Sequence, residues 1–304
     1  MIKKDNLKKL KEWSYSRRVT LEQCPRKYYY TYYGANKKTA KNETQKEKIR
    51  FLKNIKNRYL RSGEILHLII ATYIKKLRNG IEWSEQRCLS WARSIFEKDL
   101  DFSRNYRHND ALPNDNYPPK LLLEFYYGYK DAESTCTNRF QEVEAALANF
   151  FSTQDYAELR NSAFGENVLI EELIRVKEDD LTIRGQIDFA YSNVNGAKVI
   201  DWKMGKAGGG DDSLQLISYA IAACQEFNCF PDDIELHLVH LLEGSISSYN
   251  IDKSQVFRAK ARIRQDIERM QSLENYGRNA IVEAFTPCLQ SEICKGCVYQ
   301  AVCL

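Results

Sequence analysis

Residues 184–203 read Arg-Gly-Gln-Ile-Asp-Phe-Ala-Tyr-Ser-Asn-Val-Asn-Gly-Ala-Lys-Val-Ile-Asp-Trp-Lys, and this stretch decides the fold. Two hydrophobic runs flank an Asn-Val-Asn-Gly segment, which is typical of two strands joined by a tight turn. The first run carries Asp188, and the second carries Asp201 and Lys203. We therefore expect adjacent strands that bring the two aspartates close together at one edge of a sheet.

The hydrophobic pattern on either side of this hairpin predicts a mixed α/β (α+β) protein. Apolar residues follow a helical period up to about residue 156 and a strand period over 168–203, and strands and helices alternate after that. The expected helices are at 64–78 (after Gly63), 84–100, two within 120–156, 213–227 and 253–276, with a loop at 103–119. The expected strands are at 168–177, 181–191, 198–203, 234–242 and 245–249.

The two aspartates indicate a divalent metal site. Carboxylates at one strand edge repel each other unless a cation lies between them. Mg²⁺ and Mn²⁺ prefer such oxygen ligands. Lys203 lies two residues after Asp201 and shares its strand face, so it can orient a metal-bound water. Taken alone, an Asp-x-Lys triplet is more often a surface ion pair.

Two helical motifs accompany the acidic pair. Gln215 and Tyr219 are four residues apart and share one face of the expected helix. His67 follows Gly63 by four residues on the amphipathic helix. A single histidine on such a helix is more often a core residue, and Gln-x-x-x-Tyr is more often helix surface. The order of all four motifs along the chain is what favours a functional site.

In this order the motifs resemble the RecB-like branch of the PD-(D/E)xK nuclease superfamily. The resemblance implies a restriction-endonuclease-like core with a mixed central sheet, and metal-dependent hydrolysis of phosphodiester bonds. It implies Mg²⁺ or Mn²⁺ ligands at His67, Asp188, Asp201 and the Trp202 backbone carbonyl. It also implies that Lys203 is catalytic and that Gln215 and Tyr219 contact nucleic acid or support the site. A further glutamate is expected on the first core strand, and Glu171 and Glu172 are both candidates.

Four of the nine cysteines fall in the last 17 residues. Cys294 and Cys297 form a Cys-x-x-Cys pair, and Cys303 follows. Thiolates at such spacing converge on one soft metal centre, which needs a fourth ligand. The spacing leaves Cys24 and Cys288 open as that ligand. A zinc site and free thiols are the alternatives to an iron–sulfur cluster.

The Cys-Pro-Arg-Lys-Tyr segment at 24–28 sharpens this resemblance. With the Cys-rich tail, it is similar to the iron–sulfur subgroup of RecB-like nucleases, which includes CRISPR-associated adaptation exonucleases and the AddB nuclease domain. That resemblance implies a 4Fe–4S cluster that joins the N-terminal and C-terminal segments. The implied ligands are Cys24, Cys294, Cys297 and Cys303.

Charge is unevenly distributed along the chain. Residues 1–62 hold 19 Lys and Arg but 5 Asp and Glu, a net charge of +14, whereas the remainder has a net charge of −10. A basic arm on an acidic body indicates a polyanionic partner, although a solvated helical surface is the alternative. We expect Arg17, Arg18 and Arg26 to contact DNA phosphates. Most of the tyrosines among them are expected in the core.

Composition excludes disordered and membrane-spanning classes. The 304 residues are 43% hydrophobic and 28% charged, which is ordinary for a globular protein. The longest apolar runs are too short to span a bilayer, and no secretory signal is expected, which favours a cytoplasmic protein. We expect one domain over 1–304. Its expected parts are a basic arm (1–62), a helical insertion (80–165), a catalytic sheet core (166–250) and a Cys-rich tail (277–304).

The sequence therefore predicts a metal-dependent DNA exonuclease that acts on single-stranded ends. DNA repair or recombination and CRISPR adaptation or defence are the expected settings. One alternative is an accessory nuclease subunit of a helicase or integrase complex, with little activity alone. Another is a non-catalytic DNA-binding iron–sulfur module. The sequence leaves open the polarity of cleavage, exonuclease or endonuclease action, DNA or RNA as the substrate, and a monomer or a homo-oligomer.

Overall fold

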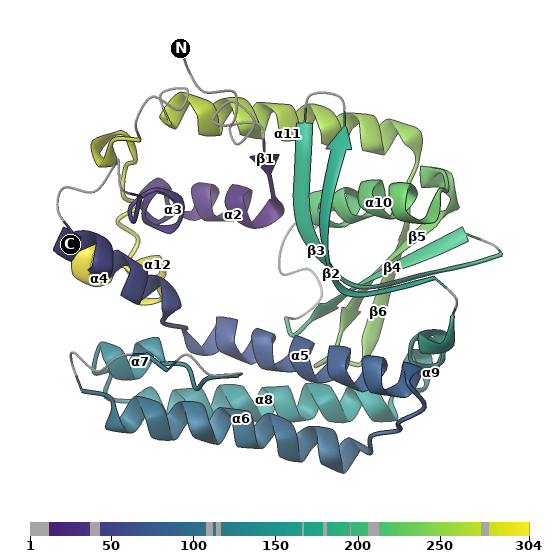
Figure 1. The fold of residues 1–304 in the computed structure, drawn as a ribbon, viewed down its shortest axis with the longest axis horizontal. Coiled ribbons are helices and arrows are strands. Elements are labelled where there is room, and N and C mark those ends of the chain that lie inside the picture. Colours follow the sequence, from purple (N-terminus) through teal and green to yellow (C-terminus); the bar gives the residue numbers. More distant parts are fainter. Residues whose placement is uncertain are drawn as a thin grey trace.

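The computed structural model has a mixed sheet with helices on both faces (Figure 1). Parts of the basic arm, residues 1–11 and 37–42, lie outside the residues that the structure describes. The described residues are 12–36, 43–107, 112–113, 117–165, 167–178, 181–194, 196–205, 213–274 and 280–303. No helix among them is long and apolar enough to cross a membrane.

The sheet confirms the expected mixed α/β fold. Antiparallel pairs join β2 to β3, β3 to β4 and β5 to β6, while β4 and β5 run parallel. Helix α10 makes the crossover that parallel neighbours require. The core strands are β2 (Val168–Glu178), β3 (Leu181–Asn193), β4 (Gly196–Lys203), β5 (Ile234–His240) and β6 (Ser245–Asn250).

Two hydrophobic cores lie on opposite faces of the sheet. Helices α10 (Ser213–Phe227) and α11 (Lys253–Leu273) pack over one core. Helices α5 (Arg58–Arg78), α6 (Glu85–Asn105) and α8 (Ala132–Ser152) pack over the other. Because β4 is buried on both faces, its sequence is hydrophobic at successive positions rather than alternating.

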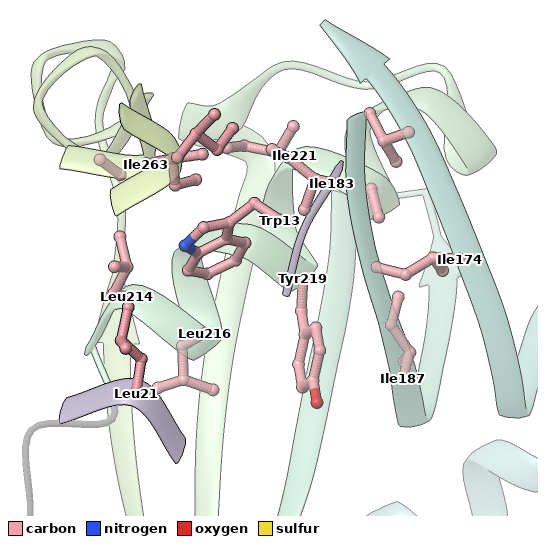
Figure 2. Close-up of a cluster of buried hydrophobic side chains, with 14 of the residues drawn as sticks. Trp13, Leu21, Ile174, Ile183, Ile187, Leu214, Leu216, Tyr219, Ile221 and Ile263 are labelled. Carbon is pink, nitrogen blue, oxygen red and sulfur yellow. The ribbon is translucent and has the colours of Figure 1, made fainter. Parts of the chain in front are cut away.

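The sequence did not reveal β1 (Glu12–Trp13), which pairs in parallel with the start of β3. Figure 2 shows Trp13 among the apolar side chains of α10, α11 and β3. The Trp13 indole Nε1 donates a hydrogen bond of 3.0 Å to Asp266 on α11. A strand of two residues is too short to show an alternating pattern in the sequence. Only the contacts of β1 with β3 and Asp266 reveal it.

The N-terminal segment forms three helices before α5 among the described residues. Pro25 is the first residue of α3 (Pro25–Tyr32), where proline's missing N–H costs nothing. Tyr28, Tyr29 and Tyr30 are buried, as predicted for this run. Helices α2 (Tyr15–Gln23) and α4 (Glu43–Asn54) complete the segment. Only two residues of α4 are buried, which explains why hydrophobic patterning did not predict it.

Several boundaries differ from prediction. Helix α5 begins at Arg58 rather than at residue 64, because the Asn57 side chain caps it by accepting a hydrogen bond from the Leu60 N–H. Gly63 therefore lies inside the helix. Helix α6 continues to Asn105, into the predicted loop. The remaining elements are α7 (Leu123–Tyr126), α9 (Ala157–Asn161), α12 (Ser291–Lys295) and α13 (Gln300–Cys303), with 3-10 turns η1 (Gln154–Tyr156), η2 (Ser162–Phe164), η3 (Pro231–Asp233) and η5 (Val282–Ala284).

Candidate active site

The hairpin places its polar residues together, as the sequence predicts. The backbone N–H of Trp202 donates to Asp188 Oδ2 over 3.0 Å. His67 on α5 lies against both strands: its Nε2 is 3.1 Å from the Trp202 carbonyl oxygen. Its Nδ1 is 3.3 Å from Asp188 Oδ1 and 3.3 Å from Glu171 Oε1. Four elements, α5, β2, β3 and β4, therefore meet at one point.

The structure brings Glu171, and not Glu172, into this group. Glu171 lies within β2, between Ile170 and Glu172, which pair with Phe189 and Ile187 of β3. Its φ of 52° lies in the left-handed region, which costs a non-glycine residue on the order of 1–3 kcal/mol. The Glu171 side chain approaches His67, whereas Glu172 is exposed. No sequence pattern revealed this backbone conformation, so both glutamates had remained candidates.

The residues present fit a divalent ion. Ligand atoms of His67, Glu171 and Asp188 all lie within 4.8 Å of one another. Glu171 Oε1 is buried and has no hydrogen-bond partner among the described residues. Burial alone would lower the pKa of His67, but the Asp188 and Glu171 carboxylates outweigh it and hold that pKa well above its usual value. The two carboxylates therefore favour positive charge here, which suits Mg²⁺ or Mn²⁺.

A second group adjoins the first. Lys203 Nζ lies 2.8 Å from Asp201 Oδ2 and donates to Gln215 Oε1 over 2.9 Å. The Gln215 amide donates to Asp201 Oδ1 over 3.2 Å and to the Tyr219 hydroxyl over 2.8 Å. Burial and the nearby Asp188 raise the pKa of Asp201 to about 7, although Lys203 opposes that rise. The network fixes the lysine and the aspartate relative to each other.

Gly185 makes room for this network. A Cβ atom at position 185 would lie 3.1 Å from a ring carbon of Tyr219, which is closer than most side-chain contacts. The ring of Tyr219 lies at the edge of the core, with its hydroxyl pointing away from Trp13 (Figure 2). The glycine in the Gly-Gln-Ile-Asp segment thus has a packing role. All six predicted catalytic residues are brought together by the fold: His67, Asp188, Asp201, Lys203, Gln215 and Tyr219.

The N-terminal and C-terminal cysteines also meet. One solvent-open pocket, with an empty volume of about 410 Å³, lies between α3 and the tail. The cysteines that line it are Cys24, Cys288, Cys294, Cys297 and Cys303. All five are free thiols, and among the described residues no three of their sulfurs lie within 4.8 Å of one another.

The three N-terminal arginines contact other groups of the protein. Arg17 donates to the Tyr28 hydroxyl over 2.6 Å and pairs with Glu274 over 3.2 Å. Arg18 pairs with Asp266 over 3.3 Å. Arg26 donates to the Phe285 carbonyl over 2.7 Å. These contacts tie α2 and α3 to α11 and the tail. DNA contact by Arg17, Arg18 and Arg26 stays a prediction.

Replacing Glu171 by glutamine tests the group of three ligands. We expect Glu171→Gln to weaken Mn²⁺ binding at least about tenfold, because a charged ligand oxygen is lost next to two other ligands. Isothermal titration calorimetry measures this affinity directly. The matched control, Glu172→Gln, changes an exposed neighbour and should bind Mn²⁺ as the unmodified protein does. Equal affinities for both variants would contradict the assignment of Glu171.

Comparison with known proteins adds two findings. The family model of the PD-(D/E)XK nuclease superfamily matches residues 12–304. A solved structure described as "Crystal structure of SSO0001" is 15% identical over 70% of this chain and 96% of that chain. Its TM-score of 0.30 is too low to support an argument about this fold. A search of curated proteins finds no match.

Proposed function

Because this chain belongs to the PD-(D/E)XK nuclease superfamily, we propose that it is a metal-dependent exonuclease that hydrolyses phosphodiester bonds at the ends of single-stranded DNA. One observation carries this proposal. The group of His67, Glu171 and Asp188 adjoins the Asp201–Lys203 ion pair, which lies at the end of the buried strand β4. Cation ligands beside a lysine provide what phosphodiester hydrolysis requires: charge neutralisation and an oriented water.

Each residue has a role in this proposal. His67, Glu171 and Asp188 would hold Mg²⁺ or Mn²⁺, with the Trp202 carbonyl and Asp201 beside them. When bound, the ion would polarise the phosphate and lower the pKa of a bound water. Lys203 would donate hydrogen bonds to the attacking water or to a phosphate oxygen. Gln215 and Tyr219 would hold Lys203 and Asp201 in place, as their hydrogen bonds indicate.

The cysteine pocket supports a second part of the proposal. Cys24, Cys294, Cys297 and Cys303 would hold a 4Fe–4S cluster, with Cys288 as the alternative ligand. In such a cluster each cysteine binds a different iron, so the sulfurs lie farther apart than around a single ion. The five thiols line one pocket, which is the observation that supports this part of the proposal. The cluster would connect α3 to the C-terminal tail.

The biological setting is part of the proposal. DNA repair or recombination and CRISPR adaptation or defence in the cytoplasm would both use such an enzyme, alone or with a helicase or integrase. An accessory subunit would show little activity until its partner is added. A non-catalytic DNA-binding module would bind DNA without cleaving it. The complete set of acidic and lysine side chains favours an active nuclease over that module.

The central experiment is a cleavage assay. The protein is purified without oxygen and incubated with end-labelled single-stranded DNA and Mn²⁺, beside Asp201→Ala and an EDTA control. We expect the unmodified protein to degrade the DNA, and both controls to prevent it. The labelled end reports polarity, and duplex DNA and RNA of the same sequence report preference. Cleavage that survives both controls would contradict the proposal.

A further inference from the structure

One face of α5 leads directly to the candidate metal site. Tyr59, Gly63 and His67 are four residues apart, so they follow one another along this face. His67 reaches the metal-binding group, as described above. Tyr59 is 54% exposed and its neighbour Leu60 is 56% exposed. An exposed aromatic ring, a glycine and a metal-site histidine therefore lie in one line.

Gly63 has no evident role within the protein. It lies in the interior of a 21-residue helix, where glycine is less favourable than alanine. Its φ is not positive, so the backbone does not require glycine. A Cβ atom at this position would meet no atom within 4 Å among the described residues, so packing does not require glycine either. A molecule that lies against this position would meet backbone rather than a side chain, so the missing Cβ permits close approach.

The ring of Tyr59 is held although it is exposed. The Arg58 and Arg139 guanidinium groups lie 4.5 Å and 5.1 Å from its ring centroid. Arg58 also donates a hydrogen bond of 3.0 Å to the Tyr59 hydroxyl. Arg139 in turn lies 3.9 Å from the sulfur of Met204, which directly follows Lys203. The two guanidinium groups hold the ring, and the half of Tyr59 that they leave exposed suits base stacking next to phosphates.

We propose that a single DNA strand lies along this face of α5, with its sugar–phosphate backbone against Gly63 and one base stacked on Tyr59. This inference rests on the proposed nuclease function and adds the path of the substrate. Eight helical residues separate Tyr59 from His67, about 12 Å along the axis. A stacked strand advances about 3.4 Å per nucleotide, so the base on Tyr59 lies about three to four nucleotides from the cleaved bond.

Substitutions at Gly63 test the close approach. Gly63→Leu introduces a good helix former, so the melting temperature should stay the same or rise. Affinity for a fluorescent 20-nucleotide single strand should fall at least about tenfold, with Gly63→Ala intermediate and Mn²⁺ affinity unchanged. Ser90→Leu places the same leucine side chain on the exposed surface of α6 as a control. Unchanged DNA affinity in Gly63→Leu would overturn the inference.

Substitutions at Tyr59 test the path of the strand with substrates of two lengths. Tyr59→Ala should lower kcat/KM about tenfold on a 20-nucleotide strand, whereas Tyr59→Phe should retain the activity because it keeps a ring. On a dinucleotide, which is too short to reach Tyr59, both variants should match the unmodified protein. Equal loss on both substrates would contradict the path. If the unmodified protein neither binds nor cleaves DNA, the proposed function itself fails, and this outcome is distinct from the failures above.

Discussion

Replacing Lys203 by alanine is expected to lower the rate of DNA cleavage by at least about 10³-fold. Lys203 Nζ is the cationic group nearest to Asp201, at 2.8 Å, and it is held by Gln215 at 2.9 Å. A positioned cation stabilises the charge that develops on the phosphate, and alanine cannot. Its removal also takes away the group that lowers the pKa of Asp201, so more of this aspartate would be protonated at neutral pH.

Lys198 provides the matched control for this prediction. It lies on the same strand, β4, and also pairs with a carboxylate, Glu158, at 2.7 Å. That pair lies away from the candidate metal-binding group, and surface ion pairs contribute about 1 kcal/mol or less to stability. Lys198→Ala should therefore cleave DNA at nearly the normal rate. Single-turnover assays with Mn²⁺ measure both variants, and circular dichroism checks that both are folded. Normal cleavage by Lys203→Ala would remove this lysine from the mechanism.

The sheet and its site could be predicted because their signals are local. Strands β3 and β4 are hydrophobic runs around one turn, and the spacing of Asp201 and Lys203 fixes their shared face. The helical spacing of Gln215 and Tyr219 likewise fixes one side of α10. Adjacency in the chain was enough to predict adjacency in space for these residues.

Other features could not be predicted because distant partners determine them. The Trp13 strand depends on β3 and on Asp266, 253 residues away. Glu171, rather than Glu172, approaches His67, which comes from the distant helix α5, and no sequence pattern signals its positive φ. Composition counts Arg17 as a basic residue, but Glu274, its acidic partner, lies 257 residues later. A charge pattern alone therefore could not distinguish a DNA-binding arginine from one that joins two helices.

The cysteines around the pocket also come from distant parts of the chain. We expect Cys24→Ser to remove the proposed cluster. Cys24 caps α3 by accepting a hydrogen bond from the Lys27 N–H at 3.4 Å. Serine is a better N-cap than most residues, so this substitution preserves the cap and removes the soft ligand. Loss of visible absorbance and of bound iron would then report on the cluster rather than on the helix.

Loss of the cluster should also lower stability. A link from Cys24 to the tail closes a loop of nearly the whole chain, and chain entropy gives such a link about 5 kcal/mol. For a chain of this size, the melting temperature should fall by roughly 5–15 °C. Cys229→Ser, at a half-buried cysteine outside the pocket, is the control.

Cys288→Ser identifies the fourth ligand: if it loses iron while Cys24→Ser keeps it, Cys288 takes that place. Colourless, iron-free unmodified protein, purified without oxygen, would contradict the cluster, and bound zinc would explain the thiols instead.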